Sequence, residues 1–440
     1  MIVKNNIYQN GINFSTLALV DSEFAKYLKP NGQLDFSDPN AVQQLTKSLL
    51  KRDFGLSVVL PQDRLCPPVP NRLNYILWVQ RLLDTTDIKL IIDWNKTVVS
   101  SSNTENNSRN DVTVYGLDIG TGASCIYPLL GCALRNNWKL FGTDTDEKSL
   151  EYARQNVTSN HLSDRISIVK TEPREPLIPF QVLGVENLKF IMCNPPFYES
   201  KEEMLKCAEA KKRPPFTACT GADFEMVTEG GEVEFISRLI DESTESKSRV
   251  QWYTSMIGKL SNLIILREKL VKLGINNYAL TDFVQGNKTK RWAIAWSFDD
   301  LRPPMDIARG LKSVPKSLLP FPSQYTFTLN LKSPSEVGEK IDTALSQLSL
   351  IWRWDKNSLT GKGVCDKDVW SRASRRKNMI ASQEKHIDIA NKCLSFGFEI
   401  QANDFCDAKK CNQVMIRWVK GHDTVLFESF CGMIKRKCSG

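Results

Sequence analysis

The fold of this chain is decided by one stretch in its first third, Val112-Thr113-Val114-Tyr115-Gly116-Leu117-Asp118-Ile119-Gly120-Thr121-Gly122-Ala123-Ser124. The first half of the stretch is rich in β-branched and aromatic residues, which favours a strand, and the strand runs into a turn with two glycines. Residues 126–134 then resume an apolar pattern that is typical of a helix. A strand, a glycine turn and a helix in this order predict an α/β unit whose turn approaches a ligand closely.

Two acids bear on the kind of ligand. A second predicted strand, 138–144, ends in Asp144, 24 residues after Gly120, and an acid there can accept hydrogen bonds from both ribose hydroxyls. Asp118 would repel a pyrophosphate but suits the positive ammonium and sulfonium groups of S-adenosylmethionine. We therefore predict an S-adenosylmethionine site that includes Asp118, Gly120, Gly122 and Asp144. The alternative is a dinucleotide-dependent dehydrogenase, although the loop lacks the full Gly-x-Gly-x-x-Gly pattern.

A second motif, Asn194-Pro195-Pro196-Phe197, follows the apolar run 188–193. The run predicts a buried strand, and two prolines cannot continue a sheet ladder, so the motif lies at the carboxyl end of a strand, where open α/β sheets bind ligands. The side-chain oxygen of Asn194 and the carbonyl of Pro195 are acceptors for the two hydrogens of an adenine amine, and Phe197 offers a face for the base. We predict that Asn194, Pro195, Pro196 and Phe197 are catalytic; the alternative is a surface turn with a core phenylalanine.

The two motifs together resemble the amino-methylating branch of Rossmann-fold methyltransferases. Longer strings resemble the methyltransferase-like protein 16 family over roughly residues 20 to 300: Arg52-Asp53-Phe54-Gly55-Leu56, Arg72-Leu73-Asn74-Tyr75-Ile76, residues 122–130, Gly230-Gly231-Glu232 and residues 291–298. The bacterial relatives of that family methylate an adenine of large-subunit ribosomal RNA. The resemblance implies an RNA adenosine N6-methyltransferase in the nucleus, with the cytoplasm as the alternative. It would act on the spliceosomal small nuclear RNA that pairs with the 5′ splice site in mRNA splicing.

The resemblance also implies a set of cofactor residues. Arg72 would meet the methionine carboxylate, and the other positions that match are Gly120, Ser124, Asp144 and Asn194. The family usually has Glu where this chain has Asp144, and the shorter acid still reaches the ribose. The loop Lys170 to Pro179 matches the family poorly, so a role in gating the cofactor is left open.

Four segments are expected. Residues 1–110 form a mostly helical extension that contacts RNA, with Asp38 and Pro39 at a helix start, and the methyltransferase core is 111–300. Residues 301–323 carry five prolines and are expected to form a stiff linker. Residues 324–440 are expected to form a smaller α+β domain that binds RNA. The predicted fold is therefore an α/β Rossmann-like class I methyltransferase sheet with a helical N-terminal extension and an α+β C-terminal domain.

Charge locates the expected RNA contacts. Residues 301–440 carry 23 Lys and Arg against 14 Asp and Glu, whereas residues 1–300 carry 35 against 36. Phosphate contacts supply much of nucleic-acid affinity, so the excess of basic residues in 301–440, the basic third of the chain, favours an RNA-binding module there. A solubilising surface is the alternative. The basic residues predicted to contact RNA are Lys211, Lys212, Arg213, Lys288, Arg291, Arg372, Arg375, Arg376 and Lys377. The alternatives are a nuclear-import signal at 211–215 and a disordered loop at 372–377.

Other classes are less favoured. The chain has 12 cysteines without paired spacing and three histidines, so neither a disulfide framework nor a metal site is expected, although Cys406, Cys411 and His422 are a conceivable set. No apolar run approaches the length that spans a bilayer, so no membrane partner is expected. Three further alternatives stay open: a ribosomal RNA adenine methyltransferase, a protein glutamine N5-methyltransferase and a catalytically silent RNA-binding scaffold.

Overall fold

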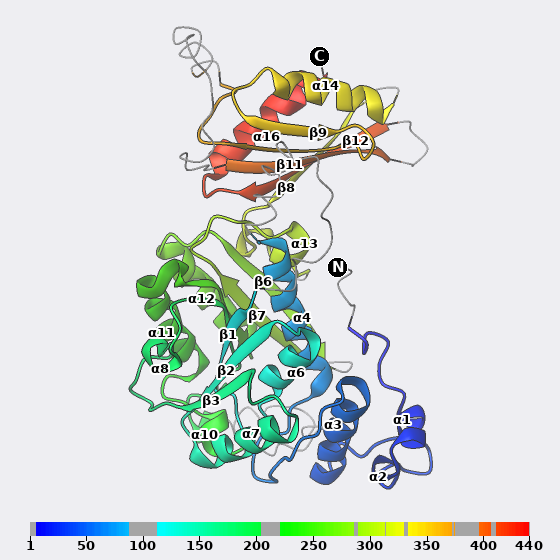
Figure 1. Ribbon diagram of the computed structural model, residues 1–440, viewed down its shortest axis with the longest axis vertical. Helices are drawn as coiled ribbons and strands as arrows, with labels where there is room; N and C mark the ends of the chain where they lie inside the picture. Colours follow the sequence, from blue (N-terminus) through cyan, green and yellow to red (C-terminus); the bar gives the residue numbers. More distant parts are fainter. Residues whose placement is uncertain are drawn as a thin grey trace. The chain divides into compact units, whose positions relative to one another are not determined.

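The computed structural model describes residues 6–87, 112–203, 221–285, 289–312, 314–329, 333–371, 374, 396–405 and 411–439. The chain divides into two compact units, Met1–Leu83 with Thr104–Phe298 and Asp84–Asn103 with Asp299–Gly440. Each unit is built on one β-sheet flanked by helices (Figure 1).

The first unit holds a seven-stranded sheet in the order β3-β2-β1-β4-β5-β7-β6. All neighbours are parallel except the pairs β5 with β7 and β6 with β7. The strands are β1 Val114–Ile119, β2 Trp138–Asp144, β3 Ile166–Lys170, β4 Leu188–Cys193, β5 Val250–Ile257, β6 Tyr278–Gln285 and β7 Thr289–Trp296. This order is the predicted Rossmann-like class I sheet, and the predicted strands that carry the two motifs are confirmed.

Helices connect the strands and cover both faces of this sheet (Figure 1). The strand order runs from β1 outward to β3 and then from β4 outward the other way, so right-handed crossovers place the two sets of helices on opposite faces. The helices are α6 Ile126–Leu134, α7 Glu147–Ser159, α8 Phe180–Leu183, α10 Asp223–Met226, α11 Gly231–Ser246, the 3₁₀ turn Lys247–Arg249 and α12 Leu260–Lys272.

The N-terminal segment is mostly helical, as predicted. It contains α1 Phe14–Val20, α2 Ser22–Ala25, α3 Pro39–Phe54 and α4 Val69–Thr85. The start of α3 is the predicted one, because Asp38 accepts a hydrogen bond from the Asn40 amide at 2.9 Å and Pro39 is the first helical residue. Gly55 ends α3 in the left-handed conformation. The predicted polar break at 100–110 lies outside the described residues.

The second unit holds a five-stranded antiparallel sheet in the order β8-β12-β11-β10-β9. Two helices pack on one face of it (Figure 1). Val337, Ile341 and Ile434 belong to the same buried core cluster as Phe398. The elements are α13 Met305–Ala308, the 3₁₀ turn Lys316–Leu318, β8 Gln324–Leu329, α14 Pro334–Ser346, β9 Ile351–Asp355, β10 Thr360–Cys365, β11 Phe396–Phe405, β12 Cys411–Lys420 and α16 Thr424–Ser439. The unit is therefore a compact α+β domain.

Strand β10 was not predicted from the sequence, because it contains glycines at alternate positions. A Cβ on Gly361 would lie 2.1 Å from the Trp352 ring, and one on Gly363 would lie 2.3 Å from the Phe398 ring. The glycines make room for the large rings of neighbouring strands. Their low strand propensity hides the strand in the sequence.

The proline-rich segment 301–323, expected as a stiff linker, packs as part of the second unit. Arg302 is 4% exposed; its Nε donates to the carbonyl of Gly421 at 2.8 Å, and its guanidinium lies 4.1 Å from the centre of the Trp418 ring. The Ser323 hydroxyl donates to the carbonyl of Pro303 at 3.0 Å. Buried contacts fix this segment, which a proline count alone does not reveal.

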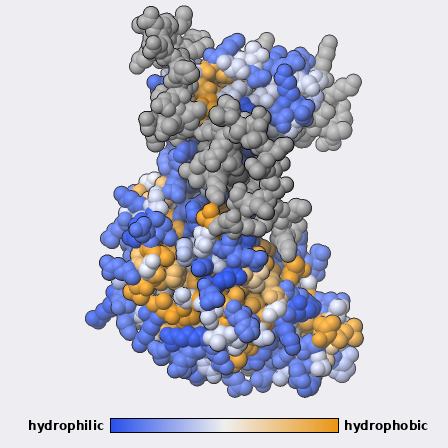
Figure 2. All heavy atoms as spheres, viewed as in Figure 1, coloured by the Kyte–Doolittle hydropathy of each residue, from blue (hydrophilic) through white to orange (hydrophobic). Residues whose placement is uncertain are grey.

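The surface in Figure 2 mixes hydrophilic residues with apolar ones. Among the described residues, no helix has the length and apolarity needed to cross a bilayer. No cluster of three or more His, Cys, Asp or Glu side chains in the described ranges is arranged to hold a metal ion; Cys406 falls outside those ranges.

Candidate active site

The two sequence motifs meet at the carboxyl edge of the first sheet. Strands β1 and β4 are parallel neighbours, and Ile119, the last residue of β1, is in register with Cys193, the last residue of β4. Gly120 and Asn194 therefore leave the sheet side by side. The strand order reverses between β1 and β4, and this is the place where doubly wound sheets bind ligands.

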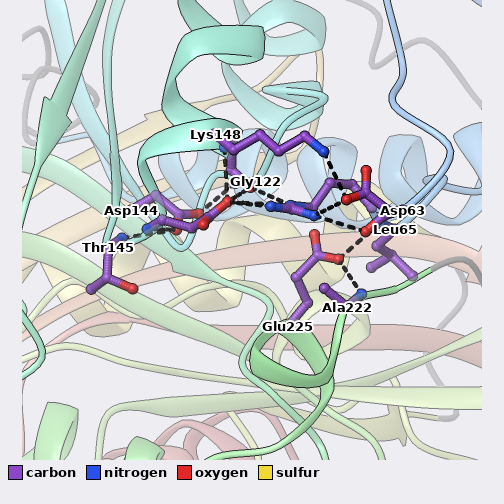
Figure 3. A network of polar contacts seen from close by, with 11 residues as sticks. Asp63, Leu65, Gly122, Asp144, Thr145, Lys148, Ala222 and Glu225 are labelled. Atoms are coloured by element: carbon purple, nitrogen blue, oxygen red, sulfur yellow. Dashed lines mark hydrogen bonds and ion pairs between the residues drawn. The ribbon is translucent and has the colours of Figure 1, made fainter.

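Two glycines give the loop after β1 a backbone conformation that residues with a side chain rarely adopt. Gly120 and Gly122 have φ values of +72° and +63°, in the left-handed region. The Gly122 amide donates to Asp144 Oδ2 at 2.9 Å. Asp144 Oδ1 accepts from the amides of Thr145 at 2.8 Å and Asp146 at 3.0 Å, which joins the loop to the end of β2 (Figure 3). Burial raises the pKa of Asp144, while the three amide donors act in the opposite direction.

A second set of polar contacts attaches the N-terminal segment to this loop region. Arg64 is 7% exposed and donates to Asp146 Oδ2 at 3.0 Å, and Asp63 accepts from Arg64 and Lys148 at 2.7 and 2.8 Å. Glu225 Oε2 accepts from the amides of Leu65 at 2.9 Å and Ala222 at 2.8 Å (Figure 3).

Asp63, Arg64 and Glu225 were not predicted from sequence. The partners of Glu225 lie as far as 160 residues away along the chain. No local pattern marks such contacts.

Arg72 is buried beside the pocket, with 6% of its surface exposed. Its Nη1 donates to the Tyr127 hydroxyl at 2.7 Å and lies 3.5 Å from the Met256 sulfur. Its Nε has no hydrogen-bond partner among the described residues. A buried guanidinium with a free donor is suited to a carboxylate, since such a donor is costly to leave unpaired.

Asp118, predicted as a cofactor-binding residue, lies inside strand β1 rather than in the pocket wall. It is 2% exposed, and it is not one of the residues that line the pocket. Burial raises the pKa of Asp118 to about 8, against the opposing effects of the Thr121 hydroxyl and the Arg72 guanidinium. A positive charge in the pocket would favour its ionised form.

The catalytic motif is held at its base by a tyrosine from α4. The Cys193 amide donates to the Tyr75 hydroxyl at 3.4 Å, and this hydroxyl lies 2.6 Å from Thr254 Oγ1, which in turn donates to the carbonyl of Ile191 at 2.8 Å. Asn194 Oδ1 is buried and has no hydrogen-bond partner among the described residues. A buried acceptor without a donor favours a ligand that brings a hydrogen-bond donor to it.

These residues surround one pocket of about 320 Å³. Eight predicted site residues line it: Arg72, Gly120, Gly122, Ser124, Asp144, Asn194, Pro195 and Pro196. Sequence reasoning missed other lining residues, among them Tyr127, Glu225, Phe235 and Arg238. Residues 171–173 and 175–177 also line the pocket, and they belong to the loop 170–179 whose role at the cofactor the sequence left open. Phe197 is not in the lining set; the guanidinium carbon of Arg291 lies 5.2 Å from the centre of its ring.

Most of the predicted RNA contacts cannot be placed. Arg291 is described, and it lies at the motif as given above. The others lie outside the described residues: Lys211, Lys212, Arg213, Lys288, Arg372, Arg375, Arg376 and Lys377.

The sheet order and the two motifs at the ends of β1 and β4 define a class I methyltransferase of the Rossmann type. A family model described as RNA methyltransferase matches residues 2–300. The chain belongs to this family, in agreement with the resemblance found in the sequence.

Named relatives agree with this membership. The chain is 34% identical to the U6 small nuclear RNA (adenine-(43)-N(6))-methyltransferase of Schizosaccharomyces pombe over 92% of this chain and 95% of that protein. It is 39% identical to the RNA N(6)-adenosine-methyltransferase METTL16 of Homo sapiens over 68% of this chain and 51% of that protein. The chain thus spans nearly the whole fission-yeast relative but about half the length of the human one.

Solved structures agree with the fold. The human Mettl16 catalytic domain in complex with hairpin 1 of the MAT2A 3′UTR is 39% identical, with a TM-score of 0.57, over 67% of this chain and 94% of that chain. The N-terminal domain of human METTL16 in complex with SAH is 37% identical, with a TM-score of 0.53, over 67% of this chain and 98% of that chain.

Proposed function

We propose that this protein transfers a methyl group from S-adenosylmethionine to N6 of an adenosine in structured RNA. We further propose that the RNA is the U6 small nuclear RNA and that the protein acts in the nucleus. The observation that carries the proposal is the buried Asn194 Oδ1, which has no hydrogen-bond partner within the described ranges and lies in the same pocket as the left-handed glycine loop. One pocket thus combines an acceptor for an amine with a loop that admits a nucleoside.

The pocket suits the cofactor at two points. Arg72 Nε has no hydrogen-bond partner among the described residues, which suits a carboxylate, and Asp144 Oδ2 accepts from one amide only, so a lone pair is left for a ribose hydroxyl. When bound, S-adenosylmethionine supplies a methyl group that is activated by a positive sulfur. A relative's domain in complex with SAH supports the same choice.

The protein's own groups would hold the adenosine. Asn194 Oδ1 and the Pro195 carbonyl accept the two amine hydrogens, which orients the nitrogen lone pair, and the base stacks on Phe197. The adenosine must leave its stack to reach the pocket, which an unpaired stretch of RNA allows at least cost. Rate then comes mainly from positioning.

The choice of RNA rests on relatives. Those of Schizosaccharomyces pombe and Dictyostelium discoideum are both named for the U6 small nuclear RNA, and human Mettl16 has been solved with RNA hairpins. The test compares N6-methyladenosine in total RNA from cells with and without the protein. We expect loss at one U6 adenosine; unchanged U6 methylation would refute the choice of RNA.

The competing reading is methylation of a protein glutamine. Its test offers purified protein and RNA fractions to the enzyme with labelled cofactor, after cofactor binding has been measured by calorimetry. We expect label in RNA. Label in protein alone would overturn the proposal, and absence of cofactor binding would instead favour a silent scaffold.

A further inference from the structure

The segment Gly230-Gly231-Glu232 begins helix α11, and the mechanism above gives it no role. Glu232 is 1% exposed. Its carboxylate accepts from three donors: the Gly258 amide at 2.6 Å, the Lys259 amide at 3.2 Å and Asn262 Nδ2 at 2.7 Å. All three donors belong to the turn between β5 and α12 or to the first turn of α12. The carboxylate of Glu232 therefore holds this turn in place through three hydrogen bonds.

The turn that Glu232 holds lies against the ring of Phe197. A Cβ added at Gly258 would lie 2.8 Å from Phe197 Cδ1 and 3.2 Å from Glu232 Oε2. Gly258 is not among the glycines with positive φ. The ring and the carboxylate, rather than a left-handed backbone, therefore exclude a side chain at this position.

Two further contacts restrict the ring. The Arg291 guanidinium carbon lies 5.2 Å from its centre, within cation–π range. The next residue, Tyr198, is held by a short bridge, since its amide donates to the Met226 carbonyl at 2.9 Å and its carbonyl accepts from the Thr228 amide at 3.0 Å. Phe197 is thus held through the backbone that follows it, by Gly258 and by Arg291.

We propose that Glu232 and Gly258 are positioning residues for the target base. They set the ring of Phe197 at the place where it stacks on the adenine whose amine faces Asn194. The inference rests on the proposed function, because it assigns a base to Phe197. It goes further, because it makes a buried carboxylate on α11 and a glycine after β5 determinants of the methyl-transfer step.

The proposal predicts a selective defect. Gly258→Ala in the full chain displaces the ring, and a misplacement of about 1 Å lowers the rate by roughly 10- to 100-fold. We expect kcat on U6 small nuclear RNA to fall by at least about tenfold. The KM and calorimetric affinity for S-adenosylmethionine should stay within about twofold, because no cofactor contact changes. Gly432→Ala, whose Cβ would meet only Arg436 Nη1 at 3.5 Å, is the matched control with wild-type activity.

A double-mutant cycle separates positioning from general damage. In a Phe197→Leu background the ring is gone, so Gly258→Ala should lower the single-turnover rate much less than in the wild type. An equal loss in both backgrounds would overturn the proposal, as would wild-type kcat for Gly258→Ala.

Glu232→Gln provides a second variant if Gly258→Ala does not fold. Its amide cannot accept from all three donors, so we expect a smaller fall in kcat with unchanged cofactor affinity. Unchanged kcat in this variant would contradict the role of Glu232. Failure of the proposed function is recognised separately, because the wild-type protein would then not methylate U6, and the inference would fall with it.

Discussion

Asn194 is the residue on which the chemistry depends. Its side-chain oxygen is buried, it has no partner among the described residues, and it lies in the pocket that the glycine loop borders. A buried acceptor without a donor costs about 1–3 kcal/mol in the ligand-free protein. A ligand amine removes that cost, so the same atom both favours binding and orients the amine.

Asp118 should make stability depend on pH. Its pKa is about 8 in the folded protein against 3.8 for a free carboxyl. Because the pKa is raised in the folded protein, this carboxyl makes its full contribution to the free energy of unfolding below pH 3.8. That contribution is lost as the pH rises through about 8. Relative to Asp118→Asn, the wild-type free energy of unfolding should fall between pH 5 and pH 9 by on the order of several kcal/mol.

Urea denaturation of both proteins across that range provides the measurement. The two share every other titrating group, so the difference between them isolates Asp118. Parallel stability curves would show that the carboxyl is not perturbed.

At the scale of elements, helix α4 supports the end of strand β4. The Tyr75 hydroxyl accepts from the Cys193 amide and lies beside Thr254. Tyr75→Phe leaves that amide without its acceptor, and we expect a loss of about 1–2 kcal/mol in the free energy of unfolding together with a lower kcat. Tyr115→Phe in β1, whose ring stacks on Phe141, is the control. Equal kcat in the two variants would show that the Tyr75 hydroxyl does not support the active site.

The loop between β3 and α8 is held by helix α11. Arg238 Nη1 donates to the carbonyl of Pro173 at 2.8 Å, and Glu242 accepts from the amides of Leu177 and Ile178 at 3.1 and 3.3 Å. The loop lines the pocket, so Arg238→Ala should raise the KM for S-adenosylmethionine by roughly 3- to 10-fold through lost hydrogen bonds. Steady-state kinetics with varied cofactor measure this. An unchanged KM would mean that the loop keeps its position without the hydrogen bonds from Arg238.

The elements that carry the site could be predicted, because their signals are local. Strand β4 ends at Cys193, with one residue between it and Pro195-Pro196, and β2 ends at Asp144, as the sequence indicates. Contacts between distant segments leave no such signal. Glu225 bonds the Leu65 amide across 160 residues, and Glu232 reaches Gly258 only because α11 packs beside β5. The catalytic motif was therefore predictable, whereas its supports were not.

At the scale of the whole molecule, charge and catalysis are separated along the chain. Residues 301–440 have an excess of nine basic residues, and the pocket lies within residues 1–298. We expect the full chain to bind U6 RNA with a steeper dependence of log K on log salt than a chain that ends at Phe298. The difference should be about 2–3 units, equivalent to three or four phosphates.

Affinity measured at several salt concentrations checks this expectation. The melting temperature of the shortened chain must be recorded as a control for folding. Equal slopes would mean that the basic third is a solubilising surface.

Mapping N6-methyladenosine in U6 small nuclear RNA, after incubation with the purified full chain and S-adenosylmethionine, tests whether Asn194 carries the methyl transfer. We expect one methylated adenosine with the wild-type protein. With Asn194→Ala we expect none, although its RNA affinity should stay within about threefold because phosphate contacts are unchanged. Methylation by Asn194→Ala at the wild-type rate, or no methylation by the wild type, would contradict the account.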